Sequence, residues 1–316
     1  MSHPPLPVAT RPPSFAIAIP QVWDRLPVDA AFLQAFLTRA EALGFHSAWV
    51  MEQILGQAAS LEPVTLLGYA AAVTRRLRLG SAVLLTPLRS PVQLAKALGS
   101  VDQLSGGRLI VGIGLGGNPR IYPAFGLSAE GRTRRLVEGL ELMKRLWSEE
   151  RVTFRGEFWT LENAAMEPKP VQRPHPPIWF GARQPAALRR AVELGDGFMG
   201  AGSSSTAEFK EQAAHVRRYL AETKRDPSTF TIGKRVYLAV DPDRERALAR
   251  LREWCGRFYG NPPLADRVAI VGDVRACLEG LREVRAAGAD LLLLNPVFDE
   301  MRHLELFARE IVPALT

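Results

Sequence analysis

Residues 77–113 read LRLGSAVL-LTPLRS-PVQLAKALGSVDQL-SGG-RLIVGI, and this stretch decides the fold class. An apolar run of strand length, 77–84, is followed by a segment whose apolar residues have helical spacing, 91–104. A second strand-like run, 108–113, comes next. Two short apolar runs separated by a helix are typical of a βαβ unit, in which the two strands lie parallel in one sheet.

The same alternation continues along the chain. Predicted strands lie at 15–19, 46–51, 77–84, 108–113, 178–181, 197–200, 230–240 and 290–294. Predicted helices lie at 28–43, 62–73, 91–104, 132–147, 185–194, 206–223, 244–258, 274–287 and 301–311. Eight strands that alternate with helices over roughly 300 residues predict a (β/α)8 TIM barrel, and the alternative is an open, doubly wound sheet.

Two segments fall outside this alternation. A proline-rich stretch at 149–177 predicts an insertion, with a small hairpin formed by 152–154 and 158–160 around Gly156. Residues 1–13 contain five prolines and lack the apolar region of a signal peptide, so they predict an N-terminal arm. Residues 14–316 are expected to form a single domain.

Composition narrows the function classes. The chain has 316 residues and a formal charge of +7, from 40 basic and 33 acidic residues. Only six of the basic residues are lysine, and the other 34 are arginines scattered over predicted helix faces. A dedicated nucleic-acid binder concentrates its charge in one patch, so a nucleic-acid partner is not expected. The two cysteines and the lack of an 18-residue apolar stretch predict a cytoplasmic protein without a membrane span.

A glycine-rich loop follows the fourth predicted strand. Residues 112–118, GIGLGGN, hold four glycines, which permit positive φ angles and a close approach of a ligand to the backbone. The alternative is a turn without a ligand. The spacing matches the dinucleotide fingerprint GxGxxG literally, but Pro119 and Pro123 follow at once and no helix is predicted to begin there. A dinucleotide site is therefore not expected.

The loops after the fifth and sixth predicted strands suggest an anion site. Residues 181–186, GARQPA, lead into a helix, whose first amide groups attract phosphate, and Arg183 adds a charge-assisted hydrogen bond. The small and hydroxylic residues of 200–205, GAGSSS, would complete a phosphate cradle. The alternative is a plain connecting turn. The five histidines show no metal-ligand spacing and no GxSxG is present, so an organic cofactor is expected to supply the chemistry.

Several motifs together resemble the luciferase-like family of flavin and deazaflavin (F420) oxidoreductases. They are GFHSAWVME at 44–52, LGSAV at 79–83, RSPVQLAK at 89–96, DQLSGGRLIVGIGLGGN at 102–118, VTFRG at 152–156, PKP at 168–170, RPHPPIWFG at 173–181, GDGF at 195–198, VG at 271–272 and AGAD at 287–290. In this order they cover nearly the whole chain, from about residue 14 to 312.

The resemblance implies a TIM barrel that binds reduced F420 or FMN at the C-terminal mouth. It implies a non-proline cis peptide at Ala82–Val83 behind the ring system, cofactor phosphate at the amides of Gly181 and Ala182, and Glu52 and Asn118 near the ring. The cofactor-binding candidates are Ala82, Val83, Gly116, Gly117, Asn118, Gly181, Ala182, Arg183, Gly200 and Ala201. The catalytic candidates are Glu52 and Gln53.

One departure from the family concerns the proton donor. Many F420-dependent members carry an acid–histidine pair after the second strand, where this chain has Glu52 and Gln53. Glutamine is not an acid at neutral pH. Either Glu52 takes the role, or substrate and water supply the proton, or the chemistry differs.

The function expected from the sequence is hydride transfer from reduced F420 to a small organic substrate. The alternatives are an FMN-dependent monooxygenase and a non-catalytic flavin-binding barrel. The loops at 53–61, 119–129 and 149–177 are expected to shape the substrate site, and the family resemblance implies a homodimer.

Overall fold

The structure is a computed structural model that describes residues 14–316. The predicted N-terminal arm, 1–13, lies outside these residues. Within them the chain forms two compact units. The first unit comprises 14–20, 42–47 and 182–316, and the second comprises 21–41 and 48–181.

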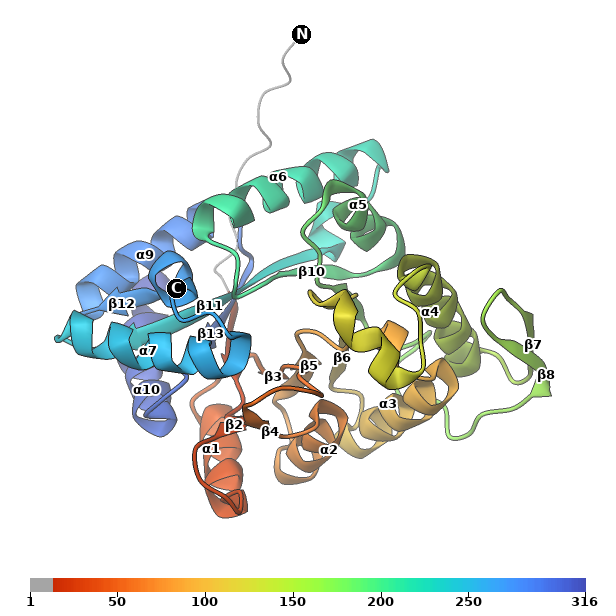
Figure 1. Ribbon diagram of the computed structural model, residues 1–316, viewed down its shortest axis with the longest axis horizontal. Coiled ribbons are helices and arrows are strands. Elements are labelled where there is room, and N and C mark those ends of the chain that lie inside the picture. Colours follow the sequence, from red (N-terminus) through yellow and green to blue (C-terminus); the bar gives the residue numbers. More distant parts are fainter. Residues whose placement is uncertain (1–13) are drawn as a thin grey trace, which may run out of the picture. The chain divides into compact units, whose positions relative to one another are not determined.

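The second unit contains the strand and helix alternation of the first half of the chain (Figure 1). Its parallel strands are β3 (Ser47–Val50), β5 (Arg78–Ser81), β6 (Leu109–Ile113) and β9 (Ile178–Phe180), which neighbour one another in that order. Its helices are α1 (Ala30–Ala42), α2 (Pro63–Val73), α3 (Pro91–Ser105) and α4 (Arg132–Ser148). Shorter pieces are β2 (Val22–Trp23), β4 (Ala59–Ser60), η1 (Thr86–Leu88) and η2 (Pro119–Phe125). Helix α3 packs between α2 and α4.

The core of the second unit depends on a glycine. A Cβ at Gly80 in β5 would lie 2.4 Å from Cε3 of Trp49 in β3, closer than real Cβ atoms come. Trp49 is 1% exposed, and its ring centroid lies 5.1 Å from that of Trp179 in β9. The absent side chain at Gly80 therefore makes room for a large aromatic ring, whose burial is a main source of stability in this core.

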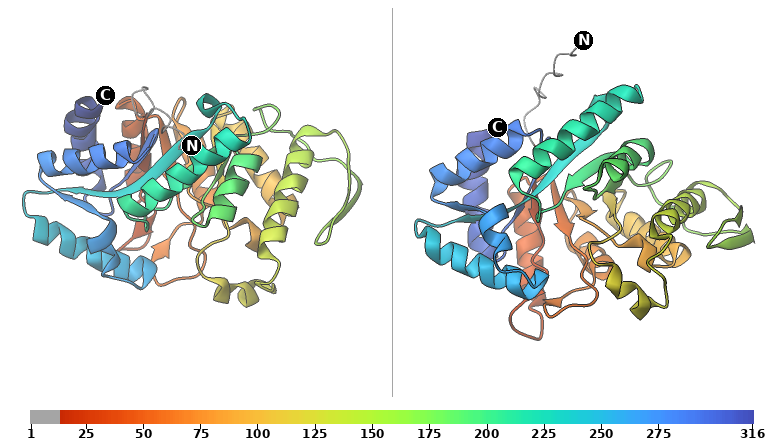
Figure 2. Two further views of the ribbon diagram at one scale, coloured as in Figure 1. Left: turned by 90° about the horizontal axis from the view of Figure 1, so that it is seen from above. Right: turned by 45° about the horizontal axis from the view of Figure 1, so that its top comes forward.

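The first unit holds the remaining parallel strands. They are β1 (Ser14–Ala18), β10 (Gly197–Gly200), β11 (Thr231–Val240), β12 (Ile270–Gly272) and β13 (Leu291–Asn295). Strand β11 is the longest, and it pairs in parallel with β10, β12 and β13, while β13 also pairs with β1. The helices are α5 (Pro185–Leu194), α6 (Thr206–Glu222), α7 (Arg244–Tyr259), α8 (Leu264–Val268), α9 (Val274–Ala286), α10 (Glu300–Leu306) and α11 (Val312–Leu315). Figure 2 shows α6, α7 and α9 outside the strands of this unit.

The strand order confirms the predicted fold. The sheet runs β10-β9-β6-β5-β3-β1-β13-β11, with β12 beside β11, and β10 also pairs with β11. Eight parallel strands in sequential order with a closing pair form a (β/α)8 barrel, so the open-sheet alternative is excluded. All eight predicted strands are present, and the short elements β2, β4, α8 and β12 were missed.

The predicted hairpin in 149–177 forms with a shift in its second strand. Strands β7 (Val152–Arg155) and β8 (Thr160–Ala164) pair antiparallel and project from the outer end of the second unit (Figure 1). The prediction placed the second strand at 158–160. The carboxylate of Glu138 accepts hydrogen bonds from the amides of Glu157, Phe158 and Trp159, which holds these residues in the connecting turn.

The last predicted helix is interrupted. Residues 301–311 were expected to form one helix, but α10 passes into a π-helical turn at Phe307–Ile311 before α11 begins. Pro313 has no backbone N–H and cannot donate to the residue four positions earlier, which accounts for the change of hydrogen-bonding pattern. Among residues 14–316, no helix has the length and apolar character needed to cross a membrane.

Candidate functional site

In the second unit, the site is built around the carboxylate of Glu52, just after β3. Its side chain is fully buried, and Oε1 accepts from Nε of Arg89 at 2.9 Å and from the same guanidinium's terminal nitrogen. Oε2 accepts a short hydrogen bond from the amide of Leu85. Arg89 also donates to Glu62 at 2.7 Å. One carboxylate therefore fixes both the backbone and a charged side chain of the segment after β5.

These contacts indicate what Glu52 does. Burial raises the pKa of Glu52 above its ordinary value, while the charge of Arg89 and the amide of Leu85 act in the opposite direction. Both carboxylate oxygens are occupied by donors, so the geometry favours a positioning role over proton donation. The predicted catalytic role of Glu52 stays a prediction.

We expect Glu52→Gln to lower the free energy of unfolding by about 2 kcal/mol, because it leaves the part-buried guanidinium of Arg89 with only Glu62 as an anionic partner. Urea denaturation measures this. The matched control is Glu157→Gln, which breaks the exposed pair with Arg134 and should change stability much less, because solvent screens an exposed ion pair. If the two substitutions lowered the free energy of unfolding equally, the pair of Glu52 with Arg89 would not be a main contributor to stability.

Gln53, the other catalytic candidate, follows directly. Its side chain folds over the next turn, because a Cβ at Gly56 would lie 2.5 Å from Cδ of Gln53. The glycine at 56 thus gives the Gln53 amide its space. No proton can leave this amide at neutral pH.

Ala82 and Val83, which follow β5, are joined by a non-proline cis peptide bond, as the resemblance implied. The amide of Ala82 donates to Val50 at 2.8 Å, and the amide of Leu84 donates to Gly112 at 2.8 Å. The cis unit is thus held on both sides by neighbouring strands. Both residues are half-buried.

The side chain of Val83 lies against two glycines. A Cβ at Gly114 would be 2.7 Å from Cγ2 of Val83, and one at Gly181 would be 3.0 Å from Cγ1. The glycines that directly follow β6 and β9 therefore leave Val83 uncovered by side chains at those positions. The family resemblance named Val83 and Gly181 as cofactor-binding residues, and the structure places Gly181 and also Gly114 beside the Val83 side chain.

Gly116, Gly117 and Asn118 lie in an exposed loop after β6. Gly116 has a φ of 75°, a conformation that favours glycine. The Asn118 side chain accepts from the amide of Arg120 at 3.0 Å and begins the short 3-10 helix η2. No helix was predicted here. Their predicted contact with a cofactor stays a prediction.

In the first unit, the predicted phosphate cradle surrounds the start of α5. Ala182 is buried and Arg183 is exposed. Arg183 donates to the hydroxyl of Ser203, which joins the loops after β9 and β10. Helix α5 begins with Pro185, as predicted, and the side chain of Gln184 does not cap it. At this helix N-terminus Pro185 has no N–H and the amide of Ala187 donates to the carbonyl of Gln184 at 2.9 Å, so in the described part of the chain the amide of Ala186 is the donor left for an anion.

The loop after β10 is held from below by Lys234, a residue that the sequence did not single out. Ala201 and Ser204 close a turn through a 3.0 Å backbone hydrogen bond. The Lys234 ammonium donates to the carbonyl of Ala201 at 2.6 Å and to that of Ser204 at 2.8 Å. Gly200 is required here, because its Cβ would lie 2.6 Å from Phe209. The feature of the sequence that could have pointed to Lys234 is the pair of adjacent basic residues, 234 and 235, within an otherwise apolar strand.

A second buried cation lies next to it in β11. Arg235 is 5% exposed and donates to Oδ1 of Asn295 at 2.7 Å and to the hydroxyl of Tyr237. The Tyr237 hydroxyl also lies 2.6 Å from that of Tyr259. Burial raises the pKa of Tyr237 well above its ordinary value, so the phenol stays neutral. Within residues 14–316 the guanidinium has neutral partners, so this end of the first unit is electropositive.

Known proteins similar to this chain have a matching architecture. The profile of the luciferase-like monooxygenase family matches residues 14–267, so the chain belongs to that family. An F420-dependent glucose-6-phosphate dehydrogenase from Kineococcus radiotolerans is 29% identical, with 90% of this chain and 92% of the relative covered.

Two further similar proteins are monooxygenases. The FMNH2-dependent dimethylsulfone monooxygenase of Pseudomonas putida is 29% identical over 76% of this chain and 66% of that protein. The crystal structure of the monooxygenase RslO1 from Streptomyces bottropensis has a TM-score of 0.83 at 26% identity, covering 96% of this chain and all of that one. The family is thus one of oxidoreductases, and its members differ in cofactor and substrate.

Proposed function

We propose that this protein is an F420-dependent oxidoreductase that transfers hydride to an activated double bond or carbonyl of a small organic substrate. The observation that carries the proposal is the cradle in the first unit, where the uncapped start of α5 and Arg183 offer donors to a phosphate. The F420-dependent relative also covers more of this chain than the FMNH2-dependent one does.

The cradle fits an anionic group on physical grounds. Among residues 14–316, the amides of Gly202 and Ser203 have no acceptor, although Gly202 is buried. A buried N–H without a partner costs about 1–3 kcal/mol, and a phosphate oxygen would remove this cost. Arg183 and Arg267 add positive charge at the same loop, where Arg267 donates to the carbonyl of Ser203 at 3.0 Å.

The residues of the second unit fit a flat ring. Val83 offers an apolar surface beside Gly114 and Gly181, which have no side chains to obstruct a ring. We propose that Ala82 and Val83 contact the ring of the cofactor, and that Gly181, Ala182, Arg183, Gly200 and Ala201 contact its phosphate. Gly116, Gly117 and Asn118 are proposed to border its side chain.

The chain's own residues would orient the reactants. Reduced F420, when bound, supplies the hydride. Glu52 holds the backbone at Leu85 and the guanidinium of Arg89, and so fixes the segment after β5. Because Gln53 has no acidic proton and both oxygens of Glu52 accept hydrogen bonds, we propose that substrate or water supplies the proton.

A groove of about 480 Å³ in the second unit is a candidate route for the substrate. It is lined by Ile54 and Phe125, which lie in the loops expected to shape the substrate site, and by the charged side chains of Glu62 and Arg89. The groove therefore combines apolar walls with an ion pair, as expected for a small molecule with a polar group.

FMN-dependent oxygenation is the second candidate, supported by the FMNH2-dependent relative. A turnover experiment separates the possibilities. Purified protein is given reduced F420 with a panel of ketones, aldehydes and conjugated alkenes, and in parallel reduced FMN with oxygen. Oxidation of F420 that depends on a substrate supports the proposal. Substrate oxygenation with FMN alone favours the second candidate, and binding without turnover favours a flavin-binding barrel.

A further inference from the structure

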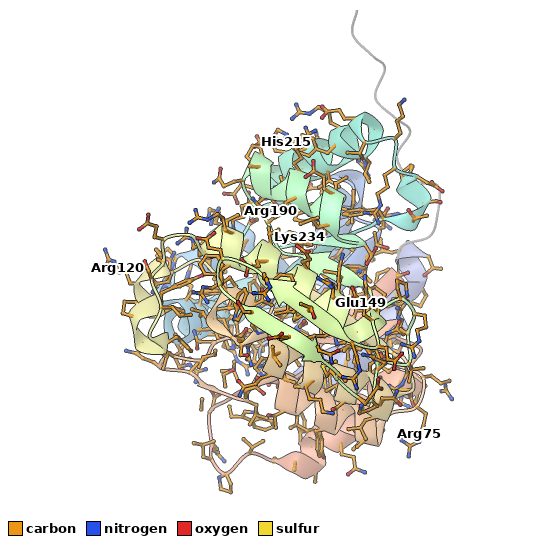
Figure 3. The ribbon with its side chains drawn as sticks, turned by 90° about the vertical axis from the view of Figure 1, so that its right-hand side faces the viewer. Arg75, Arg120, Glu149, Arg190, His215 and Lys234 are labelled. Atoms are coloured by element: carbon orange, nitrogen blue, oxygen red, sulfur yellow. The ribbon has the colours of Figure 1, made fainter. Side chains whose placement is uncertain are left out.

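Lys234 lies under the loop of the cradle. It is 3% exposed, yet its ammonium meets no carboxylate in the described part of the chain and donates to two carbonyls of the loop. A Cβ at Gly200 would lie 3.1 Å from its Cδ, so the side chain is closely packed. Figure 3 labels Lys234 together with His215 and Arg190, which lie on the outer helices α6 and α5 of the same unit.

The charges around Lys234 are mostly positive. The groups that act on it are Arg235 on its own strand, Arg183 in the loop before α5, Glu208 on α6 and Arg267 on α8. Glu208 is already engaged, because it accepts from the amide of Ser205 in the N-terminal cap of α6 and from Arg267. Three guanidinium groups and one occupied carboxylate leave Lys234 in an environment that lacks negative charge.

Resting on the function proposed above, we propose that Lys234 is a positioning residue for the cofactor's anionic group: its side chain shapes the 201–204 turn, and its ammonium contributes a titratable part of the positive charge that holds the anion. The two carbonyl contacts fix the turn that carries the amides of Gly202 and Ser203. A neutral amine retains two N–H donors, so the turn persists when the charge is lost.

The pH dependence follows from the environment. Burial, reinforced by Arg235 and Arg183, lowers the pKa of Lys234 to about 7. An anion bound at the loop favours the ammonium and raises this pKa, so binding takes up a proton and affinity falls as the pH rises above 7. The hydrogen bond from the Ser205 amide lowers the pKa of Glu208, the carboxylate that acts on Lys234, so the change near pH 7 is assigned to Lys234.

Sulfate is the first probe, since it stays doubly charged between pH 6 and 8.5. Its affinity is measured by calorimetry on the wild-type protein, Lys234→Met and the exposed control Lys210→Met. We expect the dissociation constant of the wild type to rise about threefold to tenfold between pH 6 and pH 8.5, because a pKa change of one unit corresponds to a tenfold change. Lys234→Met should bind sulfate weakly at both pH values, with a dissociation constant that does not change between them. Lys210→Met should behave as the wild type.

The wild type alone provides a second readout. Calorimetry near pH 7.5 in two buffers of different ionisation enthalpy should show uptake of a fraction of a proton with sulfate, and the same with F420. The proposal would be overturned if the sulfate affinity of Lys234→Met depended on pH as strongly as that of the wild type. It would also be overturned if the wild type did not bind sulfate. If neither F420 nor FMN binds while the sulfate slope depends on Lys234, the proposed function fails and the role of Lys234 at an anion site stands.

Discussion

Replacing Gly112 by alanine should lower the free energy of unfolding by about 3 kcal/mol, at the upper end of what overpacking costs. The Cβ of the new residue would lie 1.7 Å from the carbonyl oxygen of Ser81, a backbone atom that cannot rotate away. The two strands are also locked together, because the Ser81 hydroxyl bonds both the amide and the carbonyl of Gly112 at 2.9 Å. Urea denaturation followed by circular dichroism measures the loss.

The control for this substitution is Gly68→Ala. Gly68 lies within α2, and a Cβ there meets nothing within 4 Å. Alanine should therefore stabilise the protein by about 0.5–1 kcal/mol through its higher helix propensity. Wild-type stability of Gly112→Ala would show that β5 and β6 do not approach as closely as described.

Gly181→Asp should weaken cofactor binding about fivefold more than Gly181→Ala does. Both substitutions add a Cβ 3.0 Å from Cγ1 of Val83, so both impose the same packing cost on the neighbouring side chain. Only aspartate adds a negative charge beside the proposed phosphate position, and repulsion of about 1 kcal/mol in a solvated site corresponds to several-fold in affinity. Fluorescence titration with the cofactor measures the difference.

Thermal unfolding of both Gly181 variants controls for folding, and comparable midpoints make the affinities comparable. Equal affinities of the alanine and aspartate variants would place the phosphate away from Gly181. The proposed cradle at the start of α5 would then be wrong.

The barrel could be predicted because its signal is local. Short apolar runs and amphipathic segments alternate along the chain, and strands such as β10 and helices such as α5 begin and end at the predicted residues. The second strand of the hairpin was misplaced because Glu138, about 20 positions earlier, holds the turn. That contact has no signature in the local pattern.

The site was predicted in part. The loop positions of Arg183 and Gly200 followed from the strand ends, whereas the cis peptide at Ala82–Val83 came only from the family resemblance. The pairing of Glu52 with Arg89, 37 positions apart, needs the packing of two loops. Lys234 was not among the site residues predicted from the sequence, because its contact with the 201–204 turn depends on the direction of its side chain.

The most direct test of the proposed function is a titration of the purified protein with F420 and with FMN, in which the change in fluorescence of each cofactor is recorded. The proposal predicts saturable F420 binding in the micromolar range that is tighter than FMN binding, and weaker F420 binding in Gly181→Asp. Micromolar binding of FMN with no response to F420 would contradict it.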